Sequence, residues 1–165
     1  MVLGKGFQFL ILFYEVHLTT NEILRLPERT AYHDGTFYNV ENQESKVVFL
    51  KTCQGGIFGF FQSTNTSSLV YEVKFRTFGI ETGIWDQHQN MAKTTHPDLL
   101  PEESRFKPFY FQWANNRMVV GAGTVVGQGP KLQISNSATV TVRYISVRTG
   151  VCPLDFILEL SCRKV

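Results

Sequence analysis

The sequence predicts an all-β protein, an antiparallel β-sandwich of the jelly-roll type with little or no helix. Short segments rich in β-branched and aromatic residues recur along the chain, and Gly- or Pro-containing turns separate them. No segment keeps a 3.6-residue apolar period, which argues against packed helices. Aromatic residues make up 13% of the chain, including 14 Phe, and such side chains pack well on a pleated sheet. About ten short strands of this kind imply a sandwich.

The bulk composition is that of one ordinary globular domain over residues 1–165. Hydrophobic residues make up 43% and charged residues 18%, so the chain can bury a sizeable core. The formal net charge is only +2 and the basic residues are scattered, so no electrostatic footprint for nucleic acid or a membrane surface is present. No apolar run approaches the ~18 residues that a membrane span needs. We therefore expect neither a nucleic-acid partner nor membrane insertion.

The N-terminal apolar run, residues 7–14, is ambiguous between a strand and a secretory signal. Lys5 precedes it as in a signal peptide, but Gln8 interrupts the run. Glu15, Val16 and His17 stand where the small residues of a cleavage site belong. We expect a buried strand over residues 7–18 rather than a cleavable signal peptide, which leaves the location of the protein open.

The first half of the chain contains several further strand candidates. Residues 23–26 fit either a short strand or a single helical turn, and residues 36–40 have strand character. Residues 47–53 and 57–62 are apolar runs separated by Gln54-Gly55-Gly56, which predicts a β-hairpin. In residues 69–75, Leu69, Tyr71, Val73 and Phe75 alternate with Val70, Glu72 and Lys74, as expected of a half-buried strand.

The second half contains one long polar region and one clear hairpin. We expect a strand within residues 78–85, followed by a polar loop over residues 86–98. In residues 105–123 an aromatic run and an apolar run flank Asn115-Asn116, which indicates two strands joined by a short turn. Three more strands are expected at residues 131–135, 138–147 and 154–160.

The cysteine pattern does not resemble a secreted disulfide framework, because the count of three is odd. Cys152 and Cys162 flank a predicted strand, and ten residues at ~3.3 Å each would hold them too far apart for a bridge. Only Cys53 could pair with one of them, and we expect three reduced thiols. Asn65-Thr66-Ser67 is a chemically possible glycosylation sequon, relevant only on a secretory route.

Neither a cofactor loop nor a metal site is expected. Gly121, Gly123 and Gly127 follow a strand, but another strand rather than a helix comes next, so turns and a bulge are favoured over a nucleotide or S-adenosylmethionine cradle. The histidines lack metal-binding spacing. No Ser-containing nucleophile elbow is present in the sequence either, and we expect a protein without catalytic activity.

The most informative polar group begins at Trp85. Sugars are bound by an aromatic face against their C–H surface, while amides, carboxylates and imidazoles hold their hydroxyls. The predicted carbohydrate-binding residues are Glu81, Trp85, Asp86, His88 and Asn90. The alternative is that Trp85 ends a strand in the core and a solvated loop follows. A second group, residues 113–117, is interpreted as the tip of the predicted hairpin.

Six motifs in order resemble the farnesoic acid O-methyltransferase-like domain, over residues 46–150. They are VVFLKTCQGGIFGFFQS, LVYEVKF, GIETGIW, DLLPEESRFKPFYFQW, RMVVGAG and VRYISVRTG. The family name implies methyl transfer, whereas some invertebrate members are galactose-type lectins. A β-sandwich without a glycine-loop-to-helix site is a poor host for methyl transfer.

The resemblance and the residue inventory together favour a lectin that recognises galactose- or N-acetyllactosamine-type glycans. The alternatives are a methyltransferase and a protein-interaction β-module. Because single lectin sites bind weakly, we expect a homodimer or homotetramer that gains avidity. Glycan recognition implies an extracellular location, with a cytoplasmic one as the alternative.

Overall fold

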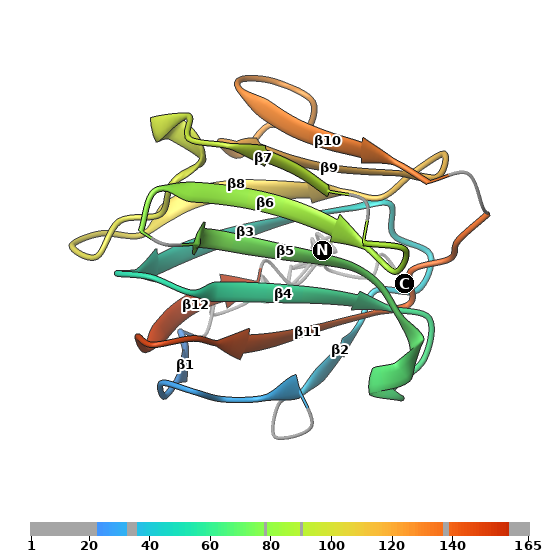
Figure 1. Cartoon of the computed structure of the whole chain (residues 1–165), viewed down its shortest axis with the longest axis horizontal. Coiled ribbons are helices and arrows are strands. Elements are labelled where there is room, and N and C mark those ends of the chain that lie inside the picture. The colour runs from blue at the N-terminus through green and yellow to red at the C-terminus, as the bar shows by residue number, and fades with distance from the viewer. Residues whose placement is uncertain (1–22, 33–35, 78, 90, 137–138, 159–165) are drawn as a thin grey trace, which may run out of the picture.

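The computed structural model describes residues 23–32, 36–77, 79–89, 91–136 and 139–158, and it forms two antiparallel six-stranded sheets stacked face to face (Figure 1). This arrangement confirms the predicted all-β sandwich. Sheet A has the order β1-β12-β3-β8-β9-β10 and sheet B the order β2-β11-β4-β5-β6-β7. The predicted strand at residues 7–18 lies outside the described residues.

The strands of sheet A are β1 (Leu24–Leu26), β12 (Leu154–Leu158), β3 (Ser45–Thr52), β8 (Lys107–Gln112), β9 (Arg117–Ala122) and β10 (Lys131–Ser135). Those of sheet B are β2 (Phe37–Asn39), β11 (Tyr144–Thr149), β4 (Gly56–Phe61), β5 (Leu69–Thr77), β6 (Glu81–Asp86) and β7 (Met91–Thr94). The short 3-10 turns η2 (Thr66–Ser68) and η3 (Pro97–Leu99) connect strands within the described part of the chain. None of the helical segments in the described part of the chain is long and apolar enough to cross a membrane.

Aromatic side chains from both sheets fill the space between them. Phe58 of sheet B and Phe111 of sheet A have ring centres 5.0 Å apart, and Phe75 and Phe109 approach to 4.8 Å. All four side chains are fully buried. These contacts explain the high Phe content, since edge-on and tilted aromatic pairs fill the core between two pleated faces.

A bulge in β5 changes the predicted alternation at its start. Phe60 pairs with Tyr71 and Phe61 with Leu69, so Val70 is an extra residue of β5 that has no pairing partner in β4. Val70 is therefore buried in the core, and Leu69 lies on the outer face with Glu72 and Lys74. The prediction that Leu69 shares the core face with Tyr71 is wrong for this reason, whereas the alternation from Tyr71 to Phe75 is confirmed.

The Gly-Gly turn after β3 does not form the predicted hairpin. β3 belongs to sheet A and β4 to sheet B, so residues 53–55 carry the chain from one sheet to the other. Gly55 has a φ of 81°, and its carbonyl accepts a hydrogen bond of 2.8 Å from the amide of Gly150 in the return crossover. A Cβ at Gly55 would lie 3.0 Å from the Gly150 Cα. Glycine is needed here because two backbones touch.

A disulfide between Cys53 and Cys152 joins these two crossovers, with Cα atoms 6.1 Å apart. The expectation of three reduced thiols is therefore wrong for this pair. The pairing depends on β3 and β12 being neighbours in sheet A, which brings the end of one strand to the start of the other. Cys162 lies outside the described residues.

The hairpin over residues 105–123 is confirmed as β8 and β9, and Asn115 and Asn116 adopt φ values of 54° and 57° at its turn. At residues 23–26 a strand, not a helical turn, is found. The polar loop predicted for residues 86–98 is wrong in part, because β7 returns beside β6 after a turn at Gln89, with a φ of 63°. The strand predicted from residue 138 begins only at Tyr144.

Candidate functional site

Trp85 lies on the outer face of sheet B, one residue before the end of β6. Its ring covers Gly83, since a Cβ built on that glycine would lie only 2.4 Å from the indole Cη2. Ile84 between them points into the core and is fully buried, while Trp85 remains half-buried. The alternative in which Trp85 packs in the core is therefore wrong. The indole is instead presented on the surface of the sheet.

Two lysines from the flanking strands approach this ring. The Lys74 Nζ on β5 lies 4.5 Å from the ring centre, and the Lys93 Nζ on β7 lies 5.8 Å from it. Cations over an indole are attracted by the negative face of its π-system. Each ammonium also has a carboxylate partner, Glu72 at 2.7 Å for Lys74 and Glu81 at 3.5 Å for Lys93. The indole therefore lies between two lysines whose charges are each balanced by a glutamate.

Glu72 is the centre of a hydrogen-bonded cluster on the same face. Its Oε1 accepts from Arg148 Nη2 at 2.7 Å and from the Tyr32 hydroxyl at 2.8 Å. Burial by itself would raise the pKa of Glu72, but hydrogen bonds from Lys74 and Arg148 outweigh burial and lower it. Burial and the adjacent carboxylate raise the pKa of Tyr32 well above its usual value. Glu72 is thus a fixed anion, and Tyr32 a fixed donor.

Glu72, Lys74 and Trp85 border a cavity of about 300 Å³, which we call the Trp85 site. Its lining residues are Leu69, Glu72, Lys74, Trp85, Asp86, Gln89 and Met91. They come from β5 and β6, from the turn after β6, and from the first residue of β7, and these three strands lie side by side in Figure 1. The site combines one aromatic surface with carboxylates, an ammonium and an amide, a set suited to a small polyhydroxylated ligand.

Two of the five predicted binding residues, Trp85 and Asp86, line this cavity. Asp86 is 7% exposed, and its Oδ1 accepts from the amide of His88 at 2.9 Å, so it also shapes the turn that follows. Glu81 is held by Lys93 at the other end of β6, and His88 is exposed beside Gln87. Asn90 lies outside the described residues.

Sequence reasoning did not select Glu72, Lys74, Leu69, Gln89 and Met91 for the site. The signal for Glu72 and Lys74 was present, because their alternation with Tyr71 and Val73 places them on the face away from the core. Leu69 joins them only through the bulge in β5. Gln89 and Met91 line the site because β7 pairs with β6. The polar sequence around them does not predict a strand at β7.

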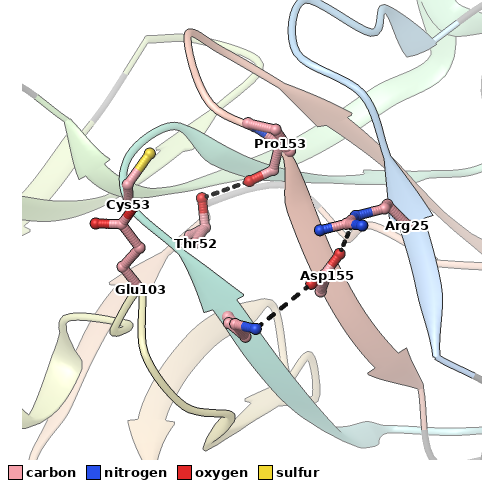
Figure 2. A pocket seen from close by; sticks show the side chains of 7 residues that line it. Arg25, Thr52, Cys53, Glu103, Pro153 and Asp155 are labelled. Carbon is pink, nitrogen blue, oxygen red and sulfur yellow. Dashed lines mark hydrogen bonds and ion pairs between the residues drawn. The ribbon is translucent and has the colours of Figure 1, made fainter.

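A second cavity, of about 240 Å³, lies on the outer face of sheet A near the disulfide (Figure 2). Asp155 stands between Arg25 and Lys51 in one cross-strand row. The Arg25 Nε lies 2.8 Å from its carboxylate, and the Lys51 Nζ lies 3.9 Å from it. The charges of this row are paired with one another across the strands, and the lining includes no aromatic residue.

A wider hollow of about 670 Å³ lies at the hairpin tip around Trp113 to Asn116. Trp113 is only 8% exposed, and its Nε1 donates to the Gln43 carbonyl at 2.8 Å. The indole is thus fixed in the fold, in keeping with the interpretation of residues 113–117 as a hairpin tip. No group of three or more His, Cys, Asp and Glu residues that could hold a metal ion occurs within the described ranges.

Comparison with known proteins gives a likeness of fold. No protein-family model matches the sequence, and no curated protein sequence matches it. Among solved structures, sheep galectin-11 in complex with glycerol is similar, with a TM-score of 0.50 and 15% sequence identity. The match covers 82% of this chain and 96% of the galectin chain.

At this identity the likeness establishes a galectin-like β-sandwich and nothing finer. The resemblance to the farnesoic acid O-methyltransferase-like domain has no support from a family model. The β-sandwich that we expected from the sequence agrees with the galectin-like fold.

Proposed function

We propose that the protein is a lectin without catalytic activity, and that it binds galactose- or N-acetyllactosamine-type glycans at the Trp85 site. The observation that carries this proposal is the indole of Trp85, laid over Gly83 on an open sheet face and bordered by carboxylates. The galectin-like fold supports the lectin class. The preference for galactose comes from the sequence resemblance alone.

In this proposal the C–H face of a sugar packs on the part of the indole that Lys74 and Lys93 leave open. The Gln89 amide donates or accepts hydrogen bonds with the hydroxyls of the sugar, and the Asp86 carboxylate accepts them. Glu72 serves as an additional acceptor, because Arg148, Lys74 and Tyr32 fix its carboxylate in place. A cavity of about 300 Å³ accommodates one or two sugar rings.

A single site of this kind would bind weakly, near millimolar or about −4 kcal/mol. We therefore expect avidity from a homodimer or homotetramer, which analytical ultracentrifugation would test. Exposure to cell-surface glycans implies an extracellular location. The Cys53–Cys152 disulfide supports that location, since disulfides persist mainly in oxidising compartments.

A glycan array tests the proposal. Binding to galactose-terminated glycans should be lost in Trp85→Ala combined with Asp86→Ala, and should be largely kept in Trp85→Phe, which retains an aromatic face. Thermal unfolding of each variant separates loss of binding from loss of fold. Array binding that survives in the double variant would reject the Trp85 site. Calorimetric heat with S-adenosylmethionine would favour a methyltransferase, and capture of a protein partner insensitive to free sugars would favour an interaction module.

A further inference from the structure

We propose that Asn65 is a site of N-linked glycosylation, so that the protein carries a covalent oligosaccharide on the loop between β4 and β5. Asn65-Thr66-Ser67 is a sequon, and no other asparagine of the sequence has Ser or Thr two residues later. This inference does not depend on the proposed lectin function.

The loop presents the sequon to solvent. Residues 62–67 are all exposed, and η2 begins directly after Asn65. The loop is closed by its own backbone, because Gln62 N donates to Ser68 O at 3.1 Å and Ser68 N donates to Asn65 O at 2.9 Å. A sugar attached here would therefore project outward without displacing core packing.

The Asn65 side chain has the geometry that such a modification needs. Its Oδ1 accepts from both the amide nitrogen and the hydroxyl of Ser67, each at 2.9 Å. These contacts use the carbonyl oxygen of the amide and leave Nδ2, the atom that would carry the sugar, outside them. The residue at the third position of the sequon is thus the one that orients the acceptor amide.

The disulfide provides a second, independent observation. Cys53 and Cys152 are linked between the two sheet crossovers, and neither cysteine belongs to the loop that carries Asn65. Stable disulfides are formed in the secretory pathway of eukaryotic cells, and N-linked glycosylation takes place in the same compartment. The exposed sequon and the disulfide therefore point to the same route through the cell.

In the reaction, Nδ2 of Asn65 attacks the anomeric carbon of a lipid-pyrophosphate-linked oligosaccharide supplied by the host transferase. A C–N bond forms, the bond from the anomeric carbon to the phosphate oxygen breaks, and lipid pyrophosphate leaves. Nδ2 loses one proton, and no oxidant or reductant takes part.

The test is expression of the full chain behind a cleavable leader in a eukaryotic cell. The chain is recovered from medium and cell together, and peptide N-glycosidase digestion in heavy-oxygen water is followed by peptide mass analysis. We expect most leader-free chains to lose mass on digestion and to show labelled aspartate at position 65. Thr66→Ala and Ser67→Thr should keep the modification, whereas Asn65→Gln and Ser67→Ala should abolish it.

Removal of the leader proves that the chain entered the secretory compartment. Leader-free chains with unmodified Asn65 would therefore overturn the proposal, and so would a glycan that remains in Asn65→Gln. This experiment does not measure sugar binding. Absence of the modification at Asn65 would therefore not bear on the lectin proposal, which the glycan array tests separately.

Discussion

The two sheets carry a similar local arrangement on their outer faces, in which an aromatic ring packs over a glycine. The glycine lies either opposite the aromatic residue on the neighbouring strand or two residues before it on the same strand. On sheet A, Tyr110 of β8 covers its cross-strand partner Gly121, where a Cβ would lie 2.0 Å from the ring. On sheet B, Trp85 covers Gly83. Tyr110 is fully buried in a small cluster with Val47, Val119 and Val126, whereas Trp85 borders an open cavity.

The difference comes from what lies above each ring. Val126, in the connection from β9 to β10, packs on the cluster around Tyr110 and closes it. The turn from β6 to β7 passes beside Trp85 and leaves its cavity open. An aromatic ring packed over a glycine therefore stabilises the fold where a loop covers the ring. Where no loop covers the ring, it remains available as a binding surface. This comparison predicts which substitutions reduce stability and which reduce binding.

The largest expected effect on stability comes from the disulfide that links the two crossovers between the sheets. Replacing Cys53 and Cys152 together by Ala removes a cross-link that closes a loop with a sequence separation of 99. The free energy of unfolding should fall by about 4 kcal/mol, because the unfolded chain regains its loop entropy. Urea denaturation followed by intrinsic tryptophan fluorescence, to which Trp85 and Trp113 both contribute, measures it. An unchanged midpoint in the double variant would contradict the prediction.

The next effect separates the two faces directly. Gly121→Ala forces a methyl group into the buried Tyr110 ring and should lower stability by about 3 kcal/mol. Gly83→Ala meets only the outer end of the half-buried Trp85 ring, which can swing aside, so its cost in stability should be well under 1 kcal/mol. Gly83→Ala should nevertheless weaken glycan binding several-fold. Equal destabilisation by the two variants would show that both rings are structural.

The smallest expected effect concerns the charge beneath the Trp85 site. Glu72→Gln should lower the free energy of unfolding by about 1–2 kcal/mol at neutral pH, since charged hydrogen bonds from Arg148 and Lys74 are weakened. The lowered pKa of Glu72 means that its contribution is complete above the unfolded-state pKa of roughly 4.3 and is lost as pH falls through the folded-state pKa.

The difference between the wild type and Glu72→Gln should accordingly be constant above about pH 5.5 and shrink on acidification. Glu102→Gln is the matched control, because its exposed pair with Arg105 has carboxylate-to-guanidinium contacts of 2.6 and 2.8 Å but lies in solvent. That variant should change stability little. A pH-independent difference for Glu72→Gln would contradict the assigned role.

Features set by neighbouring residues were predictable from the sequence. The turn at Asn115-Asn116 follows from the ease with which Asn adopts positive φ, and the alternation in β5 follows from the two-residue period of a strand. The selection of Trp85 and Asp86 rests on the same local reading. The sequence predicts a loop where the polar edge strand β7 lies, because an edge strand buries little and lacks a clear apolar pattern.

The sequence by itself determined the β-sandwich class and its main hairpin, and it selected Trp85 and Asp86 as candidate binding residues. It left open whether Trp85 lies in the core or on the surface, and the tertiary structure decided this in favour of the surface. Only the tertiary structure decided that Gly55 leads to the other sheet, that Cys53 meets Cys152, and that Glu72 joins Tyr32 and Arg148, which lie 40 and 76 residues away in the chain. Turns and alternation depend on a few adjacent residues. Sheet order and side-chain clusters instead depend on how distant strands pack, which no local pattern specifies.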